Sequence, residues 1–140
     1  MTSQLNVDTI VDKAGSGGSN VKMANTSTYV SDGGAVTQNT VQSLAKVWSL
    51  VNQQSTQSII DSFNVSSITD YSVGGTALFF TNAFSNSTYS HTNGFQRVGT
   101  SDFVNTGFDS TTTHCDFELF SGGSGADCAK LASTLHGDLA

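Results

Sequence analysis

The side chains best suited to metal binding are three histidines, His91, His114 and His136, and two cysteines, Cys115 and Cys128. None of them forms a C-x-x-C or H-x-x-x-H pair, the spacings by which structural zinc sites usually group their ligands. His114 and Cys115 are adjacent, and adjacent side chains of a strand point to opposite faces. We therefore expect no metal site.

Serine-based catalysis lacks its usual partner motifs. The run Ser43-Leu44-Ala45-Lys46 fits the S-x-x-K pattern, but S-D-N and K-T-G are absent, and we expect a solvated lysine beside a packed Trp48. Gly122-Gly123-Ser124-Gly125 lacks the spacing of a G-x-S-x-G nucleophile elbow. The glycine-rich run Ala14–Ser19 is not followed by Gly-Lys-Ser/Thr, so it does not predict phosphate binding. We expect no catalytic residue and no cofactor.

Asp116 and Glu118 are the one carboxylate pair whose spacing has chemical interest. Residues two apart on a strand share a face, so this pair could act as paired acids or, with Asp127, form a weak calcium site. A solvated acidic face is the simpler interpretation, and we favour it.

Cys115 and Cys128 flank one turn and could meet across it, but we favour free thiols for a chain that folds in a reducing compartment.

The composition favours strands and disfavours a helical bundle. The 140-residue chain has no proline and a single glutamate, Glu118, and it is rich in serine and threonine with glycine and asparagine between apolar residues. Its formal charge is −6, and its five basic residues occur singly, which argues against nucleic-acid binding. No apolar run is long enough to span a membrane, and the first residues do not resemble a signal peptide.

The pattern along the chain predicts an all-β fold. Alternation predicts a strand over Gln4–Asp12, and residues 38–51 fit either a helix or a strand; we choose a short helical turn over Gln38–Leu44 followed by a strand. Further strands are expected at Ser58–Thr69, Val73–Ala83, Ser87–Thr92, Phe95–Gly99, Thr113–Phe120 and Ala129–His136. The last two are expected to pair around the glycine-rich turn Ser121–Gly125, and Asn93-Gly94 is expected to form a type I′ hairpin turn. We predict an antiparallel, jelly-roll-like β-sandwich over residues 37–140, preceded by an extended arm over residues 1–36.

Several blocks of the sequence resemble small virion structural proteins from tailed phages of marine bacteria, such as cyanophages and pelagiphages. The most specific block is Asp61–Asp70, DSFNVSSITD, which continues in Phe80–Tyr89. The opening Leu5–Gly18, the run Leu44–Trp48 and the ending His136–Ala140 are also similar to that family.

The resemblance implies a non-enzymatic fibre, knob or head-decoration protein, commonly a homotrimer, exposed on the virion and attached through its N-terminal arm. Partners would be copies of itself and the major capsid protein or the tail or portal proteins. We expect the arm to bury Leu5, Val7 and Ile10 against the particle. The core and the subunit contacts would share five aromatic residues: Trp48, Phe63, Phe79, Phe80 and Phe84.

An alternative role is a tail-fibre or receptor-binding module that recognises host-surface carbohydrate. Exposed aromatic residues would then stack on sugar rings, with Tyr71, Tyr89 and Phe95 as candidates. The sequence alone does not place these three residues on one surface, and it does not distinguish a head location from a tail location.

Overall fold

The computed structural model describes residues 28–30, 37–39, 43–99, 103–107 and 109–138. The chain divides into two units, Met1–Val41 and Gln42–Ala140, whereas the sequence placed the boundary at 36/37. In the first unit, β1 (Thr28–Val30) pairs with β2 (Thr37–Asn39) in an antiparallel hairpin. The strand predicted over Gln4–Asp12, with Leu5, Val7 and Ile10, lies outside the described residues.

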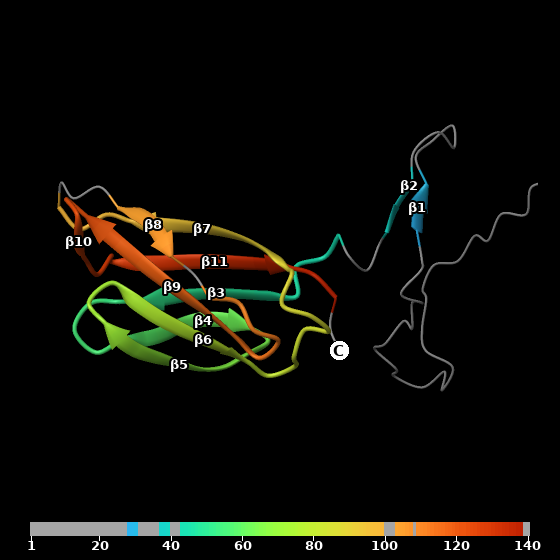
Figure 1. Ribbon diagram of the computed structural model, residues 1–140, viewed down its shortest axis with the longest axis horizontal. Coiled ribbons are helices and arrows are strands. Elements are labelled where there is room, and N and C mark those ends of the chain that lie inside the picture. Colours follow the sequence, from blue (N-terminus) through green and yellow to red (C-terminus); the bar gives the residue numbers. More distant parts are fainter. Residues whose placement is uncertain (1–27, 31–36, 40–42, 100–102, 108, 139–140) are drawn as a thin grey trace, which may run out of the picture. The chain divides into compact units, whose positions relative to one another are not determined.

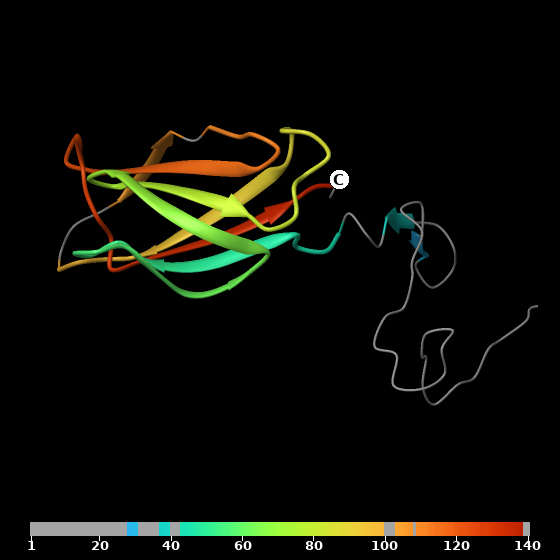
Figure 2. The same cartoon turned by 90° about the horizontal axis from the view of Figure 1, so that it is seen from below.

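The second unit is an antiparallel β-sandwich, which confirms the predicted fold class (Figures 1 and 2). One layer is a four-stranded sheet in the order β4-β3-β11-β7, and the other is a five-stranded sheet in the order β10-β9-β6-β5, with β8 also paired to β9. The strands of the first sheet are β3 (Val47–Asn52), β4 (Ser58–Phe63), β7 (Ser90–Gln96) and β11 (Lys130–His136). Those of the second are β5 (Val65–Ser72), β6 (Gly75–Phe80), β8 (Val104–Gly107), β9 (His114–Ser121) and β10 (Ser124–Gly125).

The core lies between the two sheets and follows from the alternation of side chains along the strands. In β9, the side chains of Cys115, Phe117 and Leu119 point inward, and each is at most 1% exposed. Strands β3 and β11 contribute their inward residues in the same way. The buried apolar cluster comprises Val47, Val51, Leu78, Phe80, Phe84, Tyr89, Cys115, Phe117, Leu119, Cys128, Leu131 and Leu135.

The chain crosses between the sheets at a single residue, Asn64. The predicted unbroken strand over Ser58–Thr69 is therefore wrong, because β4 belongs to the four-stranded sheet and β5 to the five-stranded one. Asn64 has φ 59°, a left-handed conformation that asparagine tolerates better than most residues. Its Nδ2 donates to the carbonyls of Lys46 and Asn82, both at 3.1 Å, and its Oδ1 accepts from Asn82 N at 2.7 Å.

A buried amide joins the sheets at their other end. Gln53 is fully buried, and its Nε2 donates to Thr76 Oγ1 at 2.8 Å and to Gly74 O at 3.4 Å. Its Oε1 accepts from the backbone N–H of Cys128 at 3.1 Å. One side chain thus satisfies groups of β6, of the turn before β6 and of the segment that leads into β11.

Two local predictions are wrong because pairing between distant segments overrides local preference. Asn93-Gly94 lies inside β7, paired with Ser133 and Ala132 of β11, so these residues are extended and form no turn. Strands β9 and β11 do not pair with each other: β9 pairs with β6, β8 and β10, and β11 pairs with β3 and β7. The glycine-rich turn instead joins β9 to the short strand β10.

The predicted helical turn over Gln38–Leu44 is also wrong. Thr37–Asn39 forms β2, and Ser43 and Leu44 lie in a turn that leads into β3. The strand predicted to follow is confirmed by β3, which pairs with β4. The described part of the chain contains no helix with the length and apolar character needed to cross a membrane.

Candidate functional site: the outer face of the five-stranded sheet

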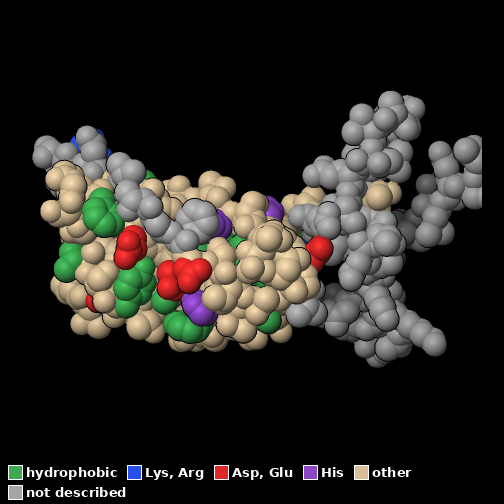
Figure 3. Space-filling view, viewed as in Figure 1, with side chains coloured by type: hydrophobic (Ala, Val, Ile, Leu, Met, Phe, Trp, Pro, Cys, Tyr) green, Lys and Arg blue, Asp and Glu red, His purple; other side chains and the backbone are tan. Residues whose placement is uncertain are grey.

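The outer face of the five-stranded sheet gathers aromatic, acidic and imidazole side chains from three strands. The register places Gly75 opposite Glu118, Ala77 opposite Asp116 and Phe79 opposite His114. Acidic, histidine and hydrophobic side chains lie next to one another on this side of the molecule (Figure 3). We call this surface the Tyr71 face and define it by Tyr71, Phe79, His114, Asp116 and Glu118.

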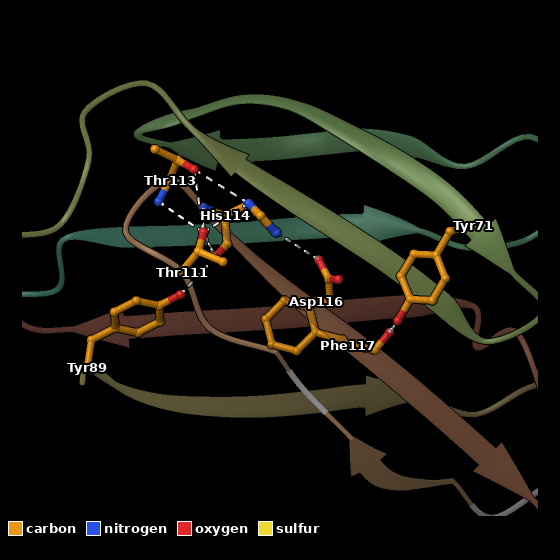
Figure 4. Close-up of polar contacts among 7 residues, drawn as sticks. All are labelled: Tyr71, Tyr89, Thr111, Thr113, His114, Asp116 and Phe117. Carbon is orange, nitrogen blue, oxygen red and sulfur yellow. Dashed lines mark hydrogen bonds and ion pairs between the residues drawn. The ribbon is translucent and has the colours of Figure 1, made fainter. Parts of the chain in front are cut away.

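Tyr71 lies across the sheet at a position where the strand beneath it carries a glycine. A Cβ atom added to Gly75 would be 2.3 Å from Oγ of Ser72 and 2.7 Å and 2.9 Å from Cε2 and Cζ of Tyr71, so the ring and the Ser72 hydroxyl occupy the space above that glycine. The Tyr71 hydroxyl crosses β6 and donates to the carbonyl of Phe117 in β9 at 2.9 Å (Figure 4). The residue nevertheless remains 43% exposed. The ring is therefore fixed at both ends while it still faces solvent.

His114 is held by its neighbours at the other end of the face. Its Nδ1 lies 2.9 Å from Thr111 Oγ1, and the same hydroxyl oxygen accepts the backbone N–H of His114 at 3.0 Å (Figure 4). The Phe79 ring packs beside the imidazole, with 5.2 Å between ring centroids. The Nε2 atom lies 4.0 Å from Asp116 Oδ1, and both side chains are 29% exposed.

Asp116 and Glu118 share the outer face, as the sequence predicted. Asp127, the third residue of the calcium alternative, accepts the backbone N–H of Gly74 through Oδ1 at 2.7 Å and so serves the β5–β6 turn. Asp116 Oδ1 is a buried atom without a hydrogen-bond partner among the described residues. The described residues contain no group of three or more histidine, cysteine or acidic residues that could hold a metal ion.

Burial and the two carboxylates act together on the Tyr71 hydroxyl. Burial, then the negative charges of Glu118 and Asp116, raise the pKa of Tyr71 from 10.0 to about 12. Burial also raises the pKa of Tyr89. Both effects favour the neutral phenol in the folded state.

We expect the free energy of unfolding to fall as the pH rises through the range from 10 to about 12. The folded state retains a proton on Tyr71 that the unfolded chain loses near pH 10, so the contribution is complete below pH 10 and is lost above it. Urea titrations at a series of pH values would measure this slope in the wild type and in Tyr71→Phe. The variant should lose part of the slope; an identical slope would contradict the assignment to Tyr71.

The two cysteines are buried free thiols, as favoured from the sequence. Burial raises the pKa of Cys115 to about 12 and that of Cys128 to about 11. His114 points outward and Cys115 inward, so the predicted separation of these neighbours is confirmed. Both thiols belong to the core rather than to a reactive site.

The structure separates the aromatic residues that the sequence left undivided between core and subunit contact. Phe80 and Phe84 are in the core, with 5.2 Å between their ring centroids. Phe79 is half-buried on the Tyr71 face, whereas Trp48 and Phe63 are 37% and 53% exposed on the four-stranded sheet. Leu5, Val7 and Ile10 lie outside the described residues.

Two expectations about individual side chains are wrong. Tyr89, a candidate for sugar stacking, is 8% exposed and stacks on Phe84 in the core, and Phe95 is half-buried against Phe103. Lys46 is 6% exposed, and the neighbouring Trp48 is the more exposed of the two, which reverses the expected arrangement. The alternation of β3 places Trp48 on the outer face of the sheet.

Sequence reasoning missed the roles of Gly75, Phe79 and His114 on this face. Gly75 falls within the predicted strand Val73–Ala83, and nothing local indicates that an aromatic ring lies over it. The pairing of Phe79 with His114 depends on the register between β6 and β9, which lie more than thirty residues apart in the sequence. Two signals in the sequence pointed to residues of this surface: the spacing of Asp116 and Glu118, and the choice of Tyr71 as a candidate for sugar stacking.

A separate open hollow of about 470 Å³ lies where β7 begins and β11 ends. Its lining is polar, and it belongs to the opposite end of the sandwich from the Tyr71 ring. The residues that line it are Asn86, Thr88, Ser90, His136, Gly137 and Asp138.

No family model, curated protein or solved structure matches this chain.

Proposed function

We propose that this chain is a non-enzymatic structural protein of a tailed-phage particle, displayed on the particle surface as a capsid decoration or short fibre. It would assemble as a homotrimer and attach through its N-terminal segment to the capsid or to tail or portal proteins. The resemblance of Asp61–Asp70 and Phe80–Tyr89 to virion proteins supports this proposal. A β-sandwich that forms a unit separate from residues 1–41 also suits a displayed domain with an attachment segment.

The observation that carries the proposal is exposed apolar surface on β3 and on the edge strand β4: Trp48 and Phe63 on the outer face of the sheet, and Ile59 and Ile60 along its edge. We call these four residues the apolar strip. Trp48 and Phe63 lie directly opposite each other in the register. Ile59 and Ile60 are 37% and 50% exposed on β4, one of the two edge strands of its sheet. Exposed apolar patches of this kind mark interaction surfaces, and an unpaired edge strand favours association with another chain.

We expect the purified chain to have three times its 14.6 kDa mass in solution. Replacing the two aromatic residues in Trp48→Thr/Phe63→Thr should convert it to single chains, because the apolar area that drives association is lost. Size-exclusion chromatography with light scattering would measure the mass, and far-ultraviolet circular dichroism would check the fold.

Val73→Thr is the matched control, since Val73 is 67% exposed and lies outside the apolar strip. It should leave the mass unchanged. A wild-type chain that stays monomeric at all concentrations, or a double variant with unchanged mass, would contradict assembly through the strip. Electron cryomicroscopy of the particle would then locate the chain: density on the capsid supports decoration, and density at the tail supports a fibre.

A second candidate function is a receptor-binding module for host-surface carbohydrate. The Tyr71 face favours it, because a fixed and exposed aromatic ring beside two carboxylates has the groups used to hold sugars. The two functions are compatible, since the apolar strip and the Tyr71 face belong to different sheets.

A further inference from the structure

We propose that the Tyr71 face binds a hydroxyl-rich, non-acidic saccharide, with the Tyr71 ring as the stacking surface and Asp116 and Glu118 as hydrogen-bond acceptors. This inference deepens the second candidate function and rests on it. It names the site, the class of ligand and the residues that would select that class.

The stacking surface is preorganised. The Tyr71 ring lies over Gly75 beside the Ser72 hydroxyl, and its own hydroxyl is fixed by the carbonyl of Phe117 at 2.9 Å. A ligand that stacks on the outer side of the ring therefore meets a side chain whose freedom has already been lost in folding. Fixing a side chain before binding reduces the entropic cost of association. A pyranose ring presents the flat apolar C–H surface that suits such a contact.

The acceptors lie beside this ring. Glu118 is directly opposite Gly75 in the register, and Asp116 follows one row further along β9. Both side chains are half-buried, and their negative charges act on the Tyr71 hydroxyl, which places them within its electrostatic reach. An ionised carboxylate accepts hydrogen bonds only, and it can accept several. A ligand with several hydroxyl donors matches this pair.

The face continues beyond the carboxylates. Phe79 lies four residues after Gly75 on β6, a separation of about 13 Å along an extended strand. With His114 packed against its ring at 5.2 Å, Phe79 offers a second, half-buried aromatic surface at that distance. The arrangement of ring, carboxylates and ring suits more than one sugar unit laid along the strand.

The distribution of charge selects against acidic saccharides. The strands of the five-stranded sheet carry Asp70, Asp116 and Glu118 and contain neither lysine nor arginine. The basic residues that the structure describes belong to the other sheet or to its flanks: Lys46 precedes β3, Arg97 follows β7, and Lys130 begins β11. A uronate or sulfate group on the Tyr71 face would meet like charge, whereas a neutral or amine-bearing sugar would not.

Affinity electrophoresis of the full chain would test the site with three soluble polysaccharides: neutral galactomannan, amine-bearing chitosan oligomers and acidic alginate. We expect retardation by the neutral or the amine-bearing polymer and none by alginate. Tyr71→Ala should weaken binding by about tenfold, the loss expected for one aromatic contact. Tyr71→Phe, which keeps the ring but loses its fixing hydrogen bond, should have a smaller effect.

Asp116→Asn and Glu118→Gln keep the shape of the acceptors and remove their charge, so each should also weaken binding. Thr92→Ala, on the exposed side of β7 in the other sheet, is the control and should bind as the wild type does. The proposal is overturned if neither the neutral nor the amine-bearing polymer retards the wild type, if alginate is preferred, or if folded Tyr71→Ala and Asp116→Asn both bind normally. These outcomes are independent of the mass measurement: a monomer that binds saccharide would overturn assembly alone, and a trimer that binds none would overturn this site alone.

Discussion

Gly74→Ala should be the most damaging small substitution in the sandwich, lowering the free energy of unfolding by about 3–5 kcal/mol. Gly74 has φ +82°, a conformation that costs any residue with a Cβ atom. The new Cβ would also lie 2.3 Å from the carbonyl oxygen of Leu119 and 2.8 Å from the backbone nitrogen of Ala126. Both obstacles are backbone atoms, one in β9 and one just after β10, so no side-chain rotation relieves the clash. Urea denaturation followed by the fluorescence of the single tryptophan, Trp48, would measure the change.

Substitutions at two other glycines would distinguish the cost of the positive φ angle from the cost of the steric clash. Gly122 has φ +61° with no atom within 4 Å of an added Cβ, so Gly122→Ala should cost only about 1–2 kcal/mol from backbone strain. Gly94 lies inside β7 without positive φ or nearby atoms, so Gly94→Ala should be neutral or slightly stabilising. Equal losses for Gly74→Ala and Gly122→Ala would show that close packing around Gly74 is not the cause.

Gln53→Leu should destabilise the protein by about 3 kcal/mol, because it leaves buried polar groups without partners. The wild-type side chain accepts from Cys128 N at 3.1 Å and donates to Thr76 Oγ1 at 2.8 Å and Gly74 O at 3.4 Å. Leucine has a similar volume but satisfies none of these groups. Urea denaturation with circular dichroism as the second probe would measure the loss. Gln54→Leu, at the exposed neighbouring position, should change stability by no more than about 0.5 kcal/mol.

Gln53→Glu distinguishes the loss of hydrogen bonds from a loss of packing. The glutamate retains an acceptor for Cys128 N, but only its protonated form can donate to Thr76 Oγ1. Burial disfavours the charged form and so should raise the pKa of this glutamate in the folded state. Its stability deficit should then be smallest in acid and should grow as the pH rises through that pKa. A deficit that does not depend on pH would contradict the role assigned to the hydrogen bonds.

Alternation along single strands accounts for what the sequence predicted correctly. The separation of His114 from Cys115, the shared face of Asp116 and Glu118 and the strand through Trp48 each depend on a period of two, which is a local property of the chain. The all-β class followed from composition in the same way. These features do not require knowledge of which strands are neighbours.

The failures concern pairing between distant segments. The turn preference of Asn93-Gly94 is overridden by seven consecutive pairs between β7 and β11. The division of one predicted strand at Asn64 depends on hydrogen bonds to Lys46 and Asn82, each eighteen residues away. The Tyr71 face could not be predicted because the residues that contact Tyr71 come from two other strands. Gly75 lies beneath its ring, and the carbonyl of Phe117 accepts its hydroxyl. Local patterns carry no information about such registers.

The position of the chain ends in the sandwich gives the domain a proximal and a distal pole. The backbone N–H of Lys46, just before β3, donates to the carbonyl of Leu135, near the end of β11, so the chain enters and leaves at the same pole. The β3–β4, β5–β6 and β9–β10 turns lie at the other pole (Figure 1). If the domain is attached through the segment before β3, these turns lie at the end of the sandwich farthest from the point of attachment. Tyr71 is two residues before the β5–β6 turn. A peptide inserted at Gly122-Gly123 would therefore lie at the distal pole. A peptide fused after His136 would lie at the proximal pole.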